Sequence, residues 1–171
     1  YRLEITSLGD AESRAAHRKE LLKYYETLEL DEATATRAKL NPLRLFDDKR
    51  PEMIAAMAKA PVLLDFLNEK SKVHFEKVRQ YLDALDVNYE INPKLVRGFD
   101  YYTGIVFEIY DNNQANRRSV FGGGRYDDLA SLFGGDRIPA VGFGMGDVTI
   151  RDFLETHGLL PKTGGAAQLH I

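Results

Sequence analysis

The sequence predicts an α+β protein in which an antiparallel sheet with flanking helices is joined to a small all-helical module. Before about residue 87, apolar residues recur at helical spacing between proline and asparagine breaks. After it, apolar and polar residues alternate, as they do in strands. The 171 residues are 44% hydrophobic and 29% charged, which is the composition of an ordinary globular protein. The length suffices for one compact domain with a small addition.

The first half is expected to hold one strand followed by helices. Asp10 is suited to cap the first helix, because an aspartate side chain accepts hydrogen bonds from the free N–H groups of a first turn. Asn41 ends the second helix, because the residue before a proline avoids the helical conformation. We expect a strand at residues 1–6, helices at about 11–28, 31–41 and 68–86, and short helical pieces divided by prolines 51 and 61.

The second half is expected to hold most of the sheet. Residues 105–110 alternate in the manner of a strand that is covered on both faces, and the asparagine-rich stretch at 111–113 favours a turn. We expect extended segments at 89–92, 105–110, 117–121 and 139–145, and helices at 125–133 and 147–157.

Composition excludes several classes of site and location. A formal net charge of -3 gives no general attraction to nucleic acid, so any such contact needs a local basic face. Without cysteine there is no disulfide and no thiolate metal site, and the four histidines are scattered without ligand spacing. No apolar run approaches the roughly 20 residues that span a bilayer, and no signal peptide is evident, which favours a cytoplasmic protein without a membrane partner.

Three clusters in the second half have the residue types of a binding site. In the first, at 95–104, Arg97 is either paired with Asp100 beside packed tyrosines or part of a polar pocket. The second, at 122–128, is a glycine-rich turn before a helix, where backbone can approach a ligand closely. The third places Gly142, Gly144 and Gly146 on one face of a strand, where a flat ring or another backbone can lie.

Together these clusters resemble a known family. Leu-Val-Arg-Gly-Phe-Asp-Tyr-Tyr at 95–102 and Gly-Gly-Gly-Arg-Tyr-Asp at 122–127 resemble the two histidine-specific motifs of the class II histidyl-tRNA synthetases. Pro-Ala-Val-Gly-Phe-Gly-Met-Gly at 139–146 is similar to the strand of the third class motif. The opening strand and Asn-Pro-Leu-Arg-Leu-Phe-Asp at 41–47 resemble the end of the second motif region and the helical insertion. The resemblance covers almost the whole chain and implies a partial class II catalytic domain.

The resemblance implies ATP-dependent activation of histidine to histidyl-adenylate and transfer of the histidyl group to tRNA. Arg97 matches the arginine at the α-phosphate, a role that suits a permanently charged guanidinium. Tyr102 and Tyr126 match tyrosines that meet the imidazole, because a phenol both donates and accepts hydrogen bonds. The implied histidine site comprises Arg97, Tyr101, Tyr102, Gly123, Gly124, Tyr126 and Gly144. The implied ATP site comprises Arg97, Gly146, Thr149 and Arg151, with Mg2+ brought by ATP and no protein-bound metal or prosthetic group.

The third motif departs from the family pattern. The family continues Gly-Leu-Glu-Arg, whereas Thr149 stands here in the place of that arginine. Arg151 lies two residues further on, about 200° around a helix. Nothing in the chain matches the first two class motifs, which build the dimer interface and supply another arginine. We therefore expect a fragment, cut at both ends from something longer, that is inactive alone.

The resemblance also implies a domain organisation and partners. It divides the chain into a core strand (1–10), the helical insertion (11–87), the C-terminal half of the core (88–160) and the linker and start of an anticodon-binding domain (161–171). In the family the insertion lies near the acceptor stem of the tRNA, so Arg14, His17 and Arg18 on one helix face are candidate phosphate contacts; such clusters are also typical of solvated faces.

Implied partners are histidine, ATP, tRNA-His and, for the longer parent, a second copy in a homodimer. The alternative is a paralogue of the synthetases that keeps the histidine pocket as a regulatory subunit of histidine biosynthesis or as a sensor. The presence of Arg97 together with both tyrosines favours the enzyme, and the altered third motif leaves room for the paralogue.

Overall fold

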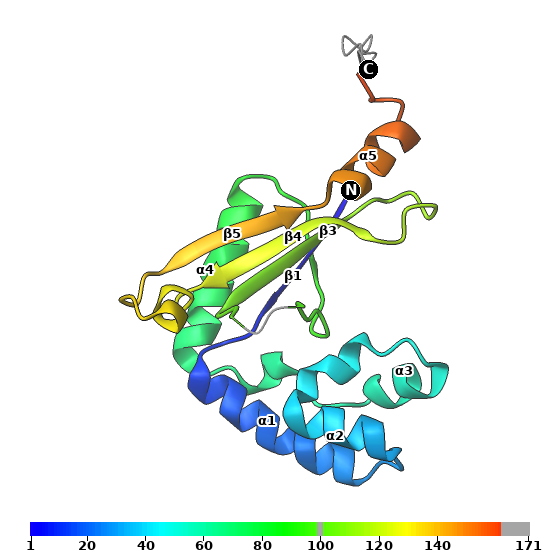
Figure 1. The fold of residues 1–171 in the computed structure, drawn as a ribbon. Helices are drawn as coiled ribbons and strands as arrows, with labels where there is room; N and C mark the ends of the chain where they lie inside the picture. Colours follow the sequence, from blue (N-terminus) through cyan, green and yellow to red (C-terminus); the bar gives the residue numbers. More distant parts are fainter. Residues whose placement is uncertain (99–100, 162–171) are drawn as a thin grey trace, which may run out of the picture.

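A computed structural model describes residues 1–98 and 101–161 and shows a five-stranded sheet with helices on and below it (Figure 1). The strand order is β2-β1-β3-β4-β5, with β2 parallel to β1 and all other neighbours antiparallel. The strands are β1 (Arg2–Ser7), β2 (Glu90–Ile91), β3 (Ile105–Tyr110), β4 (Ser119–Tyr126) and β5 (Ala140–Met145). The predicted α+β class with an antiparallel sheet is confirmed.

The predicted helices of the first half are present with ends shifted by one or two residues. The α-helices are α1 (Ala11–Glu26), α2 (Glu32–Leu40), α3 (Pro51–Met57), α4 (Glu69–Ala84) and α5 (Asp147–Thr156). Short 3-10 helices are η1 (Pro42–Asp47), η2 (Leu63–Phe66) and η3 (Ala130–Phe133). Prolines 51 and 61 do divide the stretch after α2 into short pieces, as expected.

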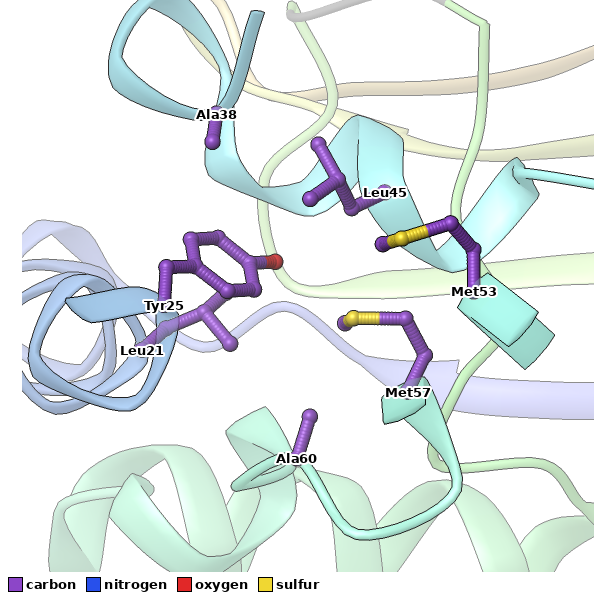
Figure 2. Packing of buried hydrophobic residues seen from close by; sticks show 7 residues of the cluster. All are labelled: Leu21, Tyr25, Ala38, Leu45, Met53, Met57 and Ala60. Carbon is purple, nitrogen blue, oxygen red and sulfur yellow. The ribbon is translucent and has the colours of Figure 1, made fainter. Parts of the chain in front are cut away.

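Helices α1, α2, η1 and α3 close around a core of their own (Figure 2). Leu21 and Leu45 are fully buried in it, and the Tyr25 hydroxyl donates a hydrogen bond to the Pro42 carbonyl oxygen at 2.7 Å. The cluster consists of Leu21, Tyr25, Ala38, Leu45, Met53, Met57 and Ala60. These residues span one continuous segment, so this module is built from local contacts.

A second core attaches α4 to the sheet. Phe75 of α4 packs with Leu3 and Ile5 of β1, together with Leu63 and Leu67. Figure 1 shows α4 crossing the back of the sheet, while α1 to α3 form a separate group below it. The change of core therefore falls near residue 61.

One carboxylate joins the starts of α1 and α4. Asp10 Oδ1 accepts a hydrogen bond from the backbone N–H of Ser13 at 3.0 Å, and its Oδ2 accepts one from Asn68 Nδ2 at 2.7 Å. Asn68 in turn caps α4 by accepting from the Ser71 N–H at 3.0 Å. The Ser13 backbone, followed by Asn68, lowers the pKa of Asp10 to about 2. The predicted cap is confirmed and also holds α4.

The structure corrects the expected glycine turn and the helix after it. Residues 122–126 continue β4, and Arg125 and Tyr126 pair with Val141 and Ala140 of β5. Only the single turn of η3 stands within the helix expected at 125–133. The three glycines lie in a strand because their backbone groups pair with β3 on one side and with β5 on the other. The local sequence cannot reveal such pairing. The strands at 105–110 and 139–145 and the helix at 147–157 are confirmed.

Two expectations lie outside the described residues. The pairing of Arg97 with Asp100 depends on residues 99–100, and the linker with the start of a further domain falls almost entirely on 162–171. Within residues 1–98 and 101–161, no helix is both long and apolar enough to cross a membrane.

We predict that Leu21→Ala lowers the free energy of unfolding by about 3 kcal/mol, because it removes a fully buried side chain and leaves a cavity in the helical core. Urea unfolding measures the change. Leu40→Ala, at a position that is 80% exposed, serves as the control and should cost less than about 0.5 kcal/mol. Equal losses for the two variants would show that the helical core contributes little.

We predict that Asp10→Asn weakens the acid sensitivity of folding. Because the pKa of Asp10 is lower in the folded chain than its ordinary value of 3.8, its charge stabilises the fold above pH 4, and this contribution is lost as the pH falls toward 2. Asparagine keeps the cap but has no charge to lose. The loss of unfolding free energy between about pH 7 and pH 3 should be smaller for Asp10→Asn than for the unsubstituted chain. For Asp136→Asn, which alters an exposed loop aspartate, the loss of unfolding free energy over the same pH range should equal that of the unsubstituted chain.

Candidate functional site

One face of the sheet is left bare by four glycines of β4 and β5. In the strand register Gly122 lies opposite Gly144, and Gly124 lies opposite Gly142. Residues two apart in a strand share a face, so all four point the same way. A Cβ added at Gly144 would meet nothing within 4 Å. We call these four residues the glycine floor.

Three side chains occupy the space above the glycine floor. A Cβ at Gly122 would stand 2.6 Å from Arg97 Nη1, and one at Gly124 would stand 2.9 Å from Tyr102 Cδ1. A Cβ at Gly142 would collide with the Tyr126 hydroxyl. Real Cβ atoms do not approach other atoms so closely, so the absence of side chains is what admits this arginine and these tyrosines.

The tyrosines form one aromatic group beside Arg97. The Tyr101 ring lies 4.6 Å from that of Tyr102 and 5.7 Å from that of Tyr126, centroid to centroid. Tyr102 is buried, and the other two are half-buried. A hydrogen bond with Tyr102, followed by burial, raises the pKa of Tyr101, so it is a neutral phenol at pH 7. The group offers hydroxyls that donate and accept within an apolar surround.

Arg97 is held by a carboxylate that the sequence interpretation missed. Its Nη1 donates to Glu108 Oε1, and the two side chains are only 15% and 14% exposed. The Tyr110 hydroxyl donates to the other oxygen of Glu108. Arg97 Nε is buried and, within the described part of the chain, has no hydrogen-bond partner. A charged residue within the apolar strand at 105–110 was the available signal.

The structure brings most of the predicted histidine-site residues together and separates one. Arg97, Tyr101, Tyr102 and Tyr126 gather around the floor, which includes Gly124 and Gly144. The prediction that Gly123 belongs to the same surface is wrong, because it points to the opposite face, where its Cβ would strike Phe143. The floor positions that sequence interpretation missed are Gly122 and Gly142, although Gly142 was recognised as one of a glycine pattern at two-residue spacing.

A cleft of about 300 Å3 lies between the helical module and this site. Tyr102 and Leu21 contribute to its walls, and its described lining contains no carboxylate. Four arginines line it: Arg14, Arg18, Arg44 and Arg97. The cleft therefore presents a positive lining, although the chain as a whole is negative.

His17 lines the same cleft as Arg14 and Arg18, as their shared helix face predicts, but its side chain is buried. His17 is 2% exposed and lies on the buried side of α1, four residues before Leu21. A nitrogen of its ring is bonded to the Pro61 carbonyl oxygen at 2.8 Å. Burial lowers its pKa, so the ring is neutral at pH 7 and is unsuited to a phosphate contact. Both arginines line the cleft.

Helix α5 begins where the sequence predicts. Gly146 is its N-cap, and the Thr149 hydroxyl in its first turn lies within hydrogen-bond distance of two carbonyl oxygens, that of Val120 at 3.0 Å and that of Gly146 at 3.1 Å. Thr149 therefore faces β4, whereas Arg151 is exposed. Because the helix starts at the predicted residue, Thr149 keeps the position where the third motif of the family has an arginine, and Arg151 does not occupy it. Within residues 1–98 and 101–161, no group of three His, Cys, Asp or Glu side chains is placed to hold a metal ion.

Comparisons with known proteins agree on one family. A family profile described as "Histidyl-tRNA synthetase" matches residues 5–148. A histidine–tRNA ligase of Corynebacterium jeikeium is 50% identical over 146 residues, which are 85% of this chain and 33% of that protein. One from Corynebacterium kroppenstedtii is 48% identical over 170 residues, or 99% of this chain and 40% of that protein. The chain thus spans two fifths or less of the length of these relatives.

Solved structures share the fold of this chain. Apo histidyl-tRNA synthetase of Staphylococcus aureus matches with a TM-score of 0.71 and 33% identity, over 94% of this chain and 40% of that one. A Bacillus halodurans protein titled "ATP phosphoribosyltransferase regulatory subunit/histidyl-tRNA synthetase" matches with a TM-score of 0.51 and 22% identity, over 88% and 43%, which shows the shared fold alone. The family profile covers most of the sequence, so this chain belongs to the histidyl-tRNA synthetase family.

Proposed function

We propose that this chain is the amino-acid-binding half of the catalytic domain of a histidine–tRNA ligase. The observation that carries the proposal is the placement of Arg97 and the three tyrosines over the glycine floor in a chain of this family. The parent enzyme condenses histidine with ATP and then esterifies tRNA-His. It acts in the cytoplasm as a homodimer, and Mg2+ arrives with ATP.

The chemistry requires a cation at the reacting phosphate. A carboxylate oxygen of histidine attacks the α-phosphorus of ATP, the bond to the β-phosphate oxygen breaks, and pyrophosphate leaves. A hydroxyl at the 3' end of the tRNA then attacks the histidyl carbonyl carbon, and AMP leaves. Negative charge grows on the α-phosphate oxygens in the first step, so Arg97, whose guanidinium donates to both the carboxylate of histidine and the α-phosphate, stabilises the transition state more than the ground state.

Selection of histidine falls to the tyrosines. Tyr102 and Tyr126 exchange hydrogen bonds with the two imidazole nitrogens, and Tyr101 closes the aromatic wall. An amino acid without these nitrogens leaves buried hydroxyls unpaired, which is costly. Gly144, with open space above it, admits the ligand.

The ATP side is incomplete in this chain. Gly146 and Thr149 border the site at the start of α5, and Arg151 lies outside it. We therefore expect no synthetase activity from the 171 residues alone. The alternative is a paralogue that binds histidine as a regulator. It is favoured only by Thr149 in place of the third-motif arginine, and the retained Arg97 weighs against it.

The helical module is proposed to contact the acceptor end of the tRNA. Arg14 and Arg18 of α1 and Arg44 of η1 line the positive cleft next to Arg97. Phosphates are attracted to such a lining, and the terminal nucleotide must reach the site that Arg97 borders. On the packing described above, this module comprises residues from about 11 to 61, and α4 belongs to the catalytic core.

We predict that millimolar histidine shifts the amide NMR signals of Tyr102, Gly124 and Tyr126 in this chain. Tyr126→Phe should weaken binding by about tenfold, because the variant cannot form one hydrogen bond to imidazole. Tyr81→Phe, at an exposed tyrosine of α4, should leave the affinity unchanged. If the unsubstituted chain shows no shift, this half does not form a histidine pocket by itself.

We predict that an acceptor-stem minihelix of tRNA-His binds this chain with an affinity that falls steeply as salt is raised from about 50 to 200 mM. Arg14→Gln with Arg18→Gln should reduce the salt slope by about one unit for each phosphate that the variant no longer neutralises. Lys72→Gln with Lys77→Gln on α4 removes the same charge away from the cleft and should change the slope little. Fluorescence anisotropy measures both, and salt-independent binding contradicts the assignment.

A further inference from the structure

Glu108 lies directly across from another glutamate in the sheet, which is electrostatically unfavourable. In the strand register it lies opposite Glu4 of β1 on one side and Gly122 of β4 on the other. Glu4 is 9% exposed and the Glu108 side chain 14%. Like charges directly opposite on neighbouring strands repel, so this arrangement does not arise from packing alone.

Each of the two carboxylates has its own partners. Glu4 accepts hydrogen bonds from Arg2 Nε at 2.9 Å and from Asn92 Nδ2 at 2.7 Å. Glu108 accepts from Arg97 Nη1 with one oxygen and from the Tyr110 hydroxyl with the other. Burial, followed by the bond to Glu108, raises the pKa of Tyr110, so this phenol remains a donor. Both oxygens of Glu108 are thus fixed.

The guanidinium of Arg97 is confined on several sides. Glu108 engages Nη1, and the Tyr102 ring lies 5.9 Å from Cζ. Gly122 has no side chain, so Nη1 can lie close to it; a Cβ at this position would be only 2.6 Å from Nη1. A partly buried ion pair adds little net stability, because desolvation offsets the attraction, but it fixes direction. A free arginine side chain samples many rotamers, whereas this one is preorganised.

We propose that Glu108 is a positioning residue, which holds the Arg97 guanidinium over the glycine floor in the orientation that meets the carboxylate of the amino-acid substrate, with Gly122 supplying the space. This inference rests on the proposed function of the site as a histidine pocket. It assigns a role to a carboxylate that does not itself touch the ligand.

The test compares two probes on the 171-residue chain. L-histidine carries the carboxylate, and histamine has the same imidazole and amine without it. By NMR titration, Glu108→Gln should raise the dissociation constant for L-histidine about tenfold and change that for histamine less than about twofold. Gly122→Ala should weaken L-histidine binding too, but it also disturbs the strand pair, because its Cβ would stand 2.6 Å from Nη1, 2.8 Å from the Phe107 carbonyl oxygen and 2.9 Å from Glu108 Cγ. Glu4→Gln, a buried carboxylate on the same face with other partners, should change neither.

A mutant cycle separates positioning from a structural role. In an Arg97→Ala background, Glu108→Gln should have no further effect on L-histidine binding. Equal weakening of both probes by Glu108→Gln, or unchanged histidine binding, overturns the inference. If Glu108→Gln does not fold, as its amide spectrum reveals, Glu108→Asp decides in the same way, because it keeps the charge but shortens the reach to Arg97 Nη1. If the unsubstituted chain binds neither probe, the histidine pocket itself fails, and the inference fails with it.

Discussion

The bare face of β4 and β5 is the constraint on which the rest of the site depends. Each glycine inside a strand costs roughly 0.5 to 1 kcal/mol, and the floor contains four. The opposite face must therefore provide the side-chain contacts: there Phe121 and Phe143 approach to 5.5 Å between ring centroids. The backbone of β4 is also paired on both sides, by β3 and β5. Contacts on the back of the sheet therefore stabilise it, while its front accommodates Arg97, Tyr102 and Tyr126 over the glycines.

The same front face concentrates charge that a purely structural sheet would avoid. Glu4 and Glu108 lie opposite each other, and two arginines, Arg2 and Arg97, balance them. Replacing such a buried network with apolar residues of similar volume is often neutral or stabilising. Its presence beside a glycine floor is therefore better explained by ligand geometry than by stability. The aromatic group on the other side of Arg97 excludes water and strengthens these interactions.

Sequence patterns predicted the elements whose signal is local. The caps at Asp10 and Asn41, the strand at 105–110 and the start of α5 are set by neighbouring residues, and the structure places them as expected. Three glycines followed by polar residues resemble a turn before a helix, and only pairing with β3 and β5 makes them a strand. The likeness in sequence motifs predicted Arg97 and the tyrosines as site residues, and the structure brings them together. The likeness could not identify Glu108 or separate Gly123 from Gly124, because both depend on cross-strand register. The burial of His17 could not be predicted, because a histidine on a helix fits either an exposed basic cluster or a buried hydrogen bond.

The division into two cores determines the geometry of the cleft. Its arginines come from both sides, since Arg14 and Arg18 lie on α1 while Arg97 belongs to the segment above the sheet. The helical core and the sheet core share no residues. Polar links between the two parts include His17 to the Pro61 carbonyl, Asn68 to Asp10, and Arg44 to the Gly98 carbonyl, and the rings of His17 and Phe66 lie 5.4 Å apart. Such links resist small displacements less than a shared apolar core does, because each contributes only about 1 kcal/mol. The spacing between the two sets of arginines is therefore set by contacts such as His17 with Pro61 and Phe66, rather than by one shared core.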